Sequence, residues 1–199
     1  MVPGPPPRVF PAGCAAGAPA FALPLPCQTM ERMTADRTLI VMRHAAAGDL
    51  PGGPDVVRAL RPRGRQDAAA AGRWMAGRGV RPDRVLCSPA RRARQTWQHV
   101  GAELAAAPEV IGEARLYQAG PRELLEIIGS LAGAAQTLLC VGHNPAAADA
   151  TELLIGRPVE FPAAGIAIID IKVPWPDLIT GAGDGAGDLI TSWSPGRVP

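Results

Sequence analysis

Short apolar runs recur along the chain and are separated by longer stretches of mixed polarity. The runs Thr38–Met42, Arg84–Cys87 and Thr137–Val141 contain mostly aliphatic residues with little polar interruption. Such runs are typical of strands that are buried on both faces of a mostly parallel sheet. Two later runs, Gly165–Ile171 and Leu189–Trp193, predict two further strands.

Between these runs, apolar residues recur at three- and four-residue spacing, which predicts helices. Three sets show this spacing, and a fourth helix is expected around Leu153 and Leu154: Ala68, Ala71 and Met75; Ala93, Trp97, Val100 and Leu104; Leu124, Ile128 and Leu131. The alternation predicts an α/β fold, a three-layer sandwich whose central, mostly parallel sheet carries helices on both faces. We place this single domain at residues 38–199.

Prolines mark the expected starts of several helices. Ser88-Pro89, Gly120-Pro121 and Asn144-Pro145 each place a capping-type residue before a proline at the first helical position, where no N–H is needed. Arg61-Pro62 is expected to open another helix without a side-chain cap. Two of the capped starts follow a strand directly, so their free N–H groups and positive dipole ends face the edge where the strands end. This arrangement favours an anion at that edge.

Cationic and imidazole side chains gather where the strands end. Arg43 and His44 follow the first strand, His143 and Asn144 follow the third, and Arg92 lies one turn into the helix after the second. Taken singly, such residues are usually a surface arginine or a hydrogen-bonded histidine. Together at the ligand-binding edge of one sheet, they favour phosphoryl transfer through a histidine. One imidazole would be neutral and attack, and the other would stay protonated against the phosphate.

Further arginines surround this predicted site. Arg91 and Arg94 are expected to point to solvent, because they lie roughly 100° and 200° around the helix from Arg92, which faces the site. Arg58, Arg61 and Arg63 beside the opening either steer an acidic partner or are only solvated, and the sequence leaves both readings open.

Composition excludes several other classes. The net charge of +2 does not indicate nucleic acid binding, and no run is long and apolar enough to predict a membrane span. The four cysteines have neither disulfide nor metal-ligand spacing, so we expect free thiols, a cytoplasmic protein and no bound metal. The Pro-, Ala- and Gly-rich leader, residues 1–37, is expected to be disordered, or the true start is Met30 or Met33.

Three motifs in this order resemble the histidine phosphatase (phosphoglycerate mutase-like) superfamily, and most closely its short phosphohistidine phosphatases of SixA type. They are LIVMRHA, which begins at Leu39, SPARRARQT at residues 88–96 and VGHNP at residues 141–145. The stretch from Asp55 to Gly64 is also similar to the family pattern DxxRxLTxxG, although Arg61 replaces its Thr. The resemblance implies a phosphoglycerate mutase-like fold over residues 38–199.

The same resemblance assigns roles to the site. His44 resembles the nucleophile, Arg43 and Arg92 the phosphate clamps, and His143 the second phosphate-binding histidine. Asn144 beside His143 is a further candidate for phosphate binding.

The implied activity is a metal-independent phosphatase with a phosphohistidine intermediate and no cofactor. Its partner would be a phosphorylated protein, such as a His-containing phosphotransfer or carrier domain, or a small phosphorylated metabolite such as a sugar or nucleotide phosphate. A mutase and a phosphoprotein-binding pseudoenzyme are weaker alternatives. The acidic residue that the family often has two places after the nucleophile is Ala46 here. Longer family members also carry a catalytic carboxylate on an inserted lid, where this chain has Tyr117 and Gln118, so Glu113 and Asp49 are the candidates for a general acid.

Overall fold

The computed structural model describes residues 37–105 and 107–196. The predicted leader therefore lies outside the described residues, except for residue 37. Cys87 and Cys140 are buried and free, as expected for the two cysteines within the described range. No helix in this range is long and apolar enough to cross a membrane.

The described chain alternates strands with helices in the predicted order. The strands are β1 (Arg37–Arg43), β2 (Arg84–Cys87), β3 (Glu109–Gly112), β4 (Thr137–Gly142), β5 (Ile166–Ile171) and β6 (Gly187–Trp193). The α-helices are α1 (Pro62–Ala76), α2 (Arg91–Gly101), α3 (Pro121–Leu131) and α4 (Ala146–Ile155). Three short 3-10 helices, η1 (Asp55–Val57), η2 (Ala114–Tyr117) and η3 (Trp175–Leu178), lie in the connections.

The strands form one sheet in the order β3-β2-β4-β1-β5-β6. The pairs β3·β2, β2·β4 and β4·β1 are parallel, whereas β5 is antiparallel to both of its neighbours. The predicted mostly parallel sheet is thus confirmed. The sequence analysis missed β3, because this edge strand has only four residues and three of them are exposed, so it lacks a buried apolar run.

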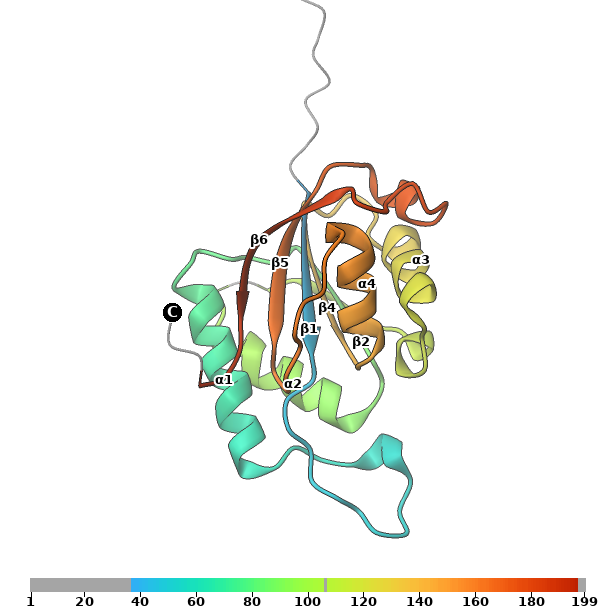
Figure 1. Cartoon of the computed structure of the whole chain (residues 1–199). Coiled ribbons are helices and arrows are strands. Elements are labelled where there is room, and N and C mark those ends of the chain that lie inside the picture. Colours follow the sequence, from blue (N-terminus) through green and yellow to red (C-terminus); the bar gives the residue numbers. More distant parts are fainter. Residues whose placement is uncertain (1–36, 106, 197–199) are drawn as a thin grey trace, which may run out of the picture. The chain divides into compact units, whose positions relative to one another are not determined.

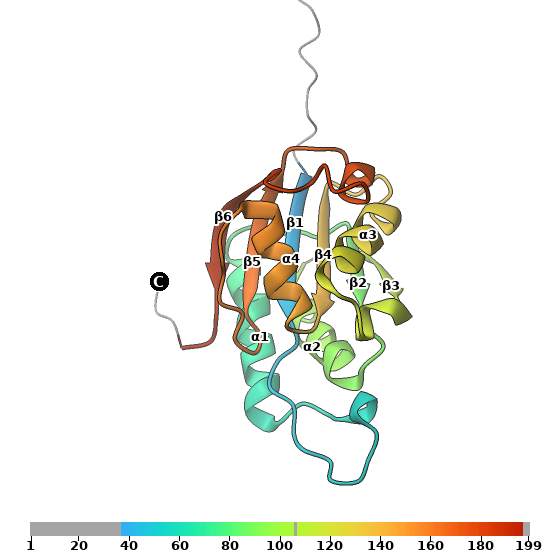
Figure 2. The same ribbon diagram turned by 45° about the vertical axis from the view of Figure 1, so that its right-hand side comes forward.

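The two faces of the sheet bury separate cores. In β1, Leu39 and Val41 face α3 and α4, while Ile40 and Met42 face α1 and α2, as the alternation of side chains along a strand requires. Figures 1 and 2 show the two helix pairs on opposite sides of the sheet, which confirms the predicted three layers. A strand covered on both faces explains why β1 reads as a continuous apolar run.

Two of the predicted helix starts are wrong. Helices α1 and α3 begin at their prolines, with Arg61 and Gly120 before them and no side-chain cap. In contrast, α2 begins at Arg91 and α4 at Ala146, so the prolines before them precede the helix. The side chains expected to cap these two helices bind elsewhere: Ser88 to His143, and Asn144 to the Phe161 carbonyl.

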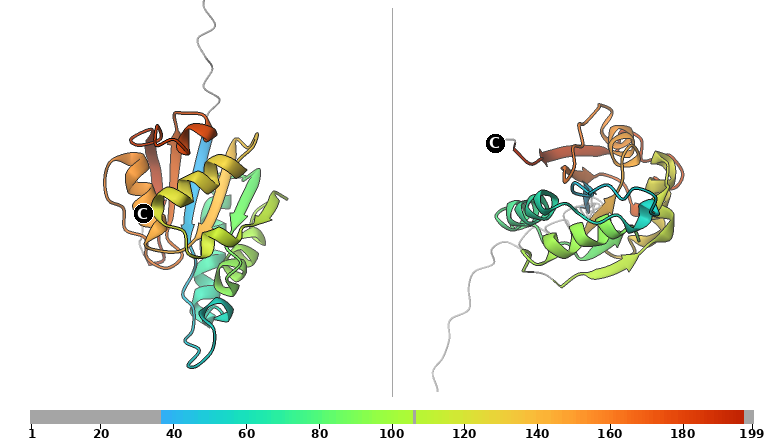
Figure 3. Two further views of the ribbon diagram at one scale, coloured as in Figure 1. Left: turned by 90° about the vertical axis from the view of Figure 1, so that its right-hand side faces the viewer. Right: turned by 90° about the horizontal axis from the view of Figure 1, so that it is seen from below.

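The connection between β1 and α1 projects beyond the ends of the parallel strands. Figure 3 shows this segment, which carries η1, extending past the edge of the sheet where β1 ends. Isolated pairing between Ala47 and Leu60 holds the base of the loop together. The loop therefore places η1 next to the predicted site.

Candidate active site

The carboxyl ends of β1, β4 and β2 bring the predicted side chains to one place. Arg43 ends β1 and is in register with Gly142 at the end of β4. His44 follows, and its backbone N–H donates to the Gly142 carbonyl over 3.0 Å. His143 leaves β4 next to it, so that the two imidazole centroids are 5.0 Å apart. Parallel pairing of two strands thus converts a large separation in sequence into contact.

Arg92 joins the two histidines. The residue is only 7% exposed, and its side chain leans from the first turn of α2 over the strand ends. Nε donates to His44 Nε2 over 3.1 Å, and one terminal nitrogen donates to His143 Nδ1 over 3.3 Å. The prediction for the helix face is confirmed, because Arg91 and Arg94 are exposed.

The hydrogen bonds of His44 define its tautomer. Nδ1 lies 2.8 Å from the Ala45 carbonyl, which can only accept, so Nδ1 carries the proton. Nε2 therefore holds the lone pair to which Arg92 donates. Burial, followed by the charges of Arg92 and Arg43, lowers the pKa of His44 to about 4. The ring is neutral at pH 7, as expected for a nucleophile.

His143 has the opposite tautomer. Because Arg92 donates to its Nδ1, the proton lies on Nε2, which donates to Ser88 Oγ over 2.8 Å. Burial, then the nearby His44 and Arg92, lowers the pKa of His143 to about 3. The surrounding side chains thus do not hold His143 protonated by themselves. The negative charge of a phosphoryl group would oppose this shift and raise the pKa.

Ser88 supports His143 from below. The serine is fully buried, and its Oγ also accepts the backbone N–H of Ala90 over 3.3 Å. Its backbone N–H donates to the Val141 carbonyl, so the chain still pairs with β4 at this point and cannot yet turn into a helix. Ser88 was predicted to cap a helix, whereas in the structure its hydroxyl orients the His143 ring.

Arg43 and Asn144 share one acceptor. A terminal nitrogen of Arg43 and the side-chain amide of Asn144 donate to the Phe161 carbonyl over 2.9 and 3.0 Å. Asn144 is therefore tied to this loop and does not cap α4, contrary to the prediction. Nε of Arg43 is buried and has no partner among the described residues. An unused buried donor beside two histidines is suited to an anion.

Asp55 is the site residue that sequence reasoning missed. Its carboxylate accepts hydrogen bonds from the Tyr117 hydroxyl over 2.8 Å and from Arg58 over 2.7 Å, and it forms an ion pair with Arg92 over 2.9 Å. These partners, with Tyr117 the foremost, lower the pKa of Asp55 to about 2. The carboxylate is thus ionised. The only signal in the sequence was the spacing of Asp55 and Arg58 in a family motif.

Tyr117 forms a wall of the site. Its ring meets the ring of His143 edge-on, with centroids 5.7 Å apart and an interplanar angle of 87°. The hydrogen bond from its hydroxyl to Asp55 joins η2 to η1 across the opening. Two loops that are far apart in sequence therefore close around the histidines.

The predicted acids lie in ion pairs elsewhere. Glu113 caps η2 and binds Arg115, whose hydrogen bonds lower the pKa of the Glu113 carboxyl. Asp49 pairs with Arg61 over 2.9 Å and is largely exposed. In the described part of the chain, neither carboxylate hydrogen-bonds to the histidines or to Arg92. Nor do the described residues contain a cluster of three His, Cys, Asp or Glu that could hold a metal ion.

Known proteins share this fold and sequence. A model of the histidine phosphatase superfamily (branch 1) matches residues 39–121. An uncharacterized protein of Mycobacterium tuberculosis is 36% identical over 151 residues, which cover 70% of this chain and 93% of that protein. The SixA structure from Nakamurella multipartitia is 30% identical with a TM-score of 0.71, covering 81% of this chain and 98% of that one.

A further SixA structure points the same way. The protein histidine phosphatase SixA, solved as a complex with tungstate, is 26% identical with a TM-score of 0.67, over 79% of this chain and 97% of that one. The predicted family is thereby confirmed: the chain belongs to the histidine phosphatase superfamily and is a SixA-like phosphatase that acts through a histidine intermediate.

Proposed function

We propose that the protein removes the phosphoryl group from phosphohistidine on a partner protein, without a metal ion, and that His44 is the nucleophile. The observation that carries this proposal is the state of the His44 ring. Its proton is held on Nδ1 by the Ala45 carbonyl, and its Nε2 lone pair lies 3.1 Å from the Arg92 guanidinium. The neutral nucleophilic nitrogen and the cation thus lie next to each other.

The reaction has two steps. Nε2 of His44 attacks phosphorus, the P–N bond to the substrate imidazole breaks, and the imidazole leaves with the bonding electrons. Water then attacks the phosphohistidine, inorganic phosphate leaves, and His44 recovers its lone pair. Arg92, now donating to Nε2, would donate to a phosphoryl oxygen instead, together with Arg43 and His143. Each charge-assisted hydrogen bond is worth about 1.5 to 3 kcal/mol.

The missing acid favours phosphohistidine over an alkyl phosphate. An alkoxide leaving group needs a general acid, worth roughly 10² to 10⁴ in rate. Asp55 cannot serve, because its partners keep its pKa at about 2. Tyr117 is a poor donor as well, since the Asp55 carboxylate raises the pKa of its phenol. A protonated phosphoimidazole leaves as neutral imidazole and needs no such help.

Asp55 also supports a leaving group without negative charge. Its side chain is 47% exposed at the opening and remains ionised. It would repel the second phosphate of a bisphosphate, but not an imidazole. The SixA relatives, one of them described as a protein histidine phosphatase, support a protein substrate. The alternative is a small phosphomonoester, such as a sugar or nucleotide phosphate.

The test compares leaving groups on one enzyme. We expect kcat/KM to be highest for a phosphohistidine-bearing protein, lower for phosphoramidate, and at least tenfold lower again for a phosphoserine peptide and a sugar phosphate. If an alkyl phosphate is the best substrate, the proposal fails. An acid would then remain to be found, and Glu113 would be the first residue to replace.

A further inference from the structure

A hollow of about 440 Å³ lies beside the active site, between α2 and the edge strand β3. It is lined by Cys87, Ser88, Pro89, Arg94, Trp97, Val110, Gly112 and Ala114. We call it the β3 groove. Cys87 and Gly112 are the last residues of their strands, so the groove opens at the same end of the sheet as the histidines.

The groove adjoins the active site through Ser88. This residue lines the groove, and its Oγ also accepts the hydrogen bond from His143 over 2.8 Å. On the far side, Ala114 begins η2, whose last residue, Tyr117, meets the ring of His143. A molecule in the groove would therefore lie against the wall of the phosphoryl site.

The walls of the groove are apolar and accessible. Val110 on β3 is 48% exposed, and Pro89 and Ala114 are also exposed, while Trp97 is half-buried. A tryptophan beside exposed aliphatic residues in a concave surface is typical of a contact site for another molecule.

One cation stands in this apolar surface without a partner. Arg94 is exposed, and its guanidinium has no ion pair or hydrogen bond in the described part of the chain. The arginines that the sequence analysis considered for steering differ in this respect. Arg58, Arg61 and Arg63 pair with Asp55, Asp49 and Asp67, respectively. The unpaired cation that lines the groove thus belongs to α2, whereas these three arginines already have carboxylate partners.

We propose that the β3 groove is the docking site for the protein that carries the phosphohistidine. An aliphatic side chain of that protein enters between Trp97 and Val110, and a neighbouring carboxylate pairs with Arg94. Charge complementarity favours this occupant, because the unpaired guanidinium of Arg94 can pair with a carboxylate that lies beside the apolar contact. The inference rests on the proposed function, and it adds where the partner binds and what it must present.

The experiment replaces two residues of the β3 groove and one residue at the opposite edge of the sheet. Val110→Glu and Arg94→Glu change the groove, while Ile190→Glu on β6 is the matched control, since Ile190 is 59% exposed at the opposite edge. Activity is measured with a phosphohistidine-bearing protein and with phosphoramidate, which has the same P–N bond but is too small to fill the groove.

Both groove variants should lower kcat/KM for the protein about tenfold or more, through KM, with phosphoramidate turnover unchanged. Ile190→Glu should change neither. The effect of Arg94 should also fade as salt rises. Equal kcat/KM for the protein in wild type and both groove variants would overturn the docking site, as would equal losses on both substrates. Failure of the proposed function is seen separately, as a preference of the wild type for an alkyl phosphate.

Discussion

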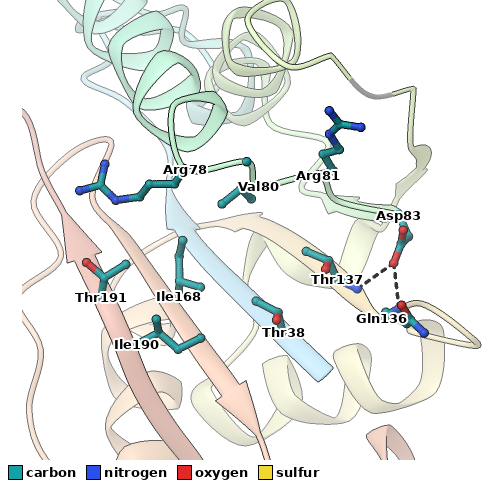
Figure 4. Close-up of a pocket in the computed structure, with 11 residues that line it drawn as sticks. Thr38, Arg78, Val80, Arg81, Asp83, Gln136, Thr137, Ile168, Ile190 and Thr191 are labelled. Atoms are coloured by element: carbon teal, nitrogen blue, oxygen red, sulfur yellow. Dashed lines mark hydrogen bonds between the residues drawn. The ribbon is translucent and has the colours of Figure 1, made fainter. Parts of the chain in front are cut away.

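The two ends of the sheet both carry a hollow, and the larger one lies away from the histidines. A hollow of about 680 Å³ lies at the end where β1 and β4 begin. Figure 4 shows Thr38, Ile168 and Ile190 among the residues around it. The active site lies at the other end, where these strands finish. Volume therefore does not identify the chemical site of this protein.

The polar groups at the two ends differ in what they have left to bind. In the larger hollow, the Asp83 carboxylate accepts the backbone N–H groups of Gln136 and Thr137, both over 2.8 Å. The Arg78 guanidinium stacks over the Trp74 ring at 4.2 Å. At the histidine end, Arg43 Nε is a buried donor without a hydrogen-bond partner among the described residues. The hydrogen bond from Arg92 to His44 can be exchanged for one to a bound anion. The direction of the strands and the unused buried donor of Arg43 mark the site.

The largest expected effect is that of His44→Ala. Turnover and phosphoenzyme formation should be lost while the fold survives, because the side chain stands at a strand end and not in a core. Acid-labile phosphate on the protein after incubation with substrate is the measurement. Label on the variant would refute the assignment of His44.

Arg92→Ala should lower turnover of phosphoramidate by about 10² to 10³, as for the loss of a transition-state donor. Arg94→Ala, two residues further along α2, should leave phosphoramidate turnover nearly unchanged, because its side chain points away from the histidines. Melting temperatures control for folding. Equal losses at both positions would contradict the orientation of the helix.

The low pKa values of the histidines should be visible in a titration. The imidazole signals of His44 and His143, followed by NMR, should change near pH 4 and 3 and not near 6.5. Between pH 6.5 and these lower pKa values, the two histidines bind more protons in the unfolded chain than in the folded one. Their contribution to stability is therefore complete above pH 6.5 and is lost as the pH falls toward 4.

This stability change has its own measurement. The melting temperature of the wild type should fall over that pH range, and replacing both histidines with Asn should flatten the curve. An NMR midpoint near 6.5 for His44 would show that the ring is not buried as described.

Asp55→Asn should alter selectivity more than rate. Removing the rim carboxylate takes away its repulsion of an acidic leaving group, an effect of about 1 kcal/mol at an exposed position. The ratio of kcat/KM for a sugar bisphosphate to that for phosphoramidate should rise about fivefold. An unchanged ratio would mean that Asp55 acts only on Arg92.

The smallest effects are expected at the larger hollow. Arg81 and Ile190 line this hollow. Replacing either with Ala should change kcat/KM by less than about twofold, as is usual for surface positions outside a site. A loss as large as that for Arg92→Ala would show that the two ends of the sheet are coupled.

Much of the architecture could be predicted from the sequence. Strands such as β1 are buried on both faces and therefore consist of continuous apolar runs. The buried residues of the helices recur at helical spacing. Strand β3 could not be found in this way, because it is short and exposed at an edge. The starts of α2 and α4 were misplaced, because Ser88 and Asn144 bind distant groups in place of their own helices.

The sequence by itself determined which groups stand at the strand ends, namely Arg43, His44 and His143, because local runs end there. Only the tertiary structure decided what these groups do to one another. Asp55 and Tyr117 come from loops with no regular pattern, and their hydrogen bond over 2.8 Å spans 62 residues. Tautomers and pKa values depend on burial and on neighbours brought together by folding, which no local pattern records.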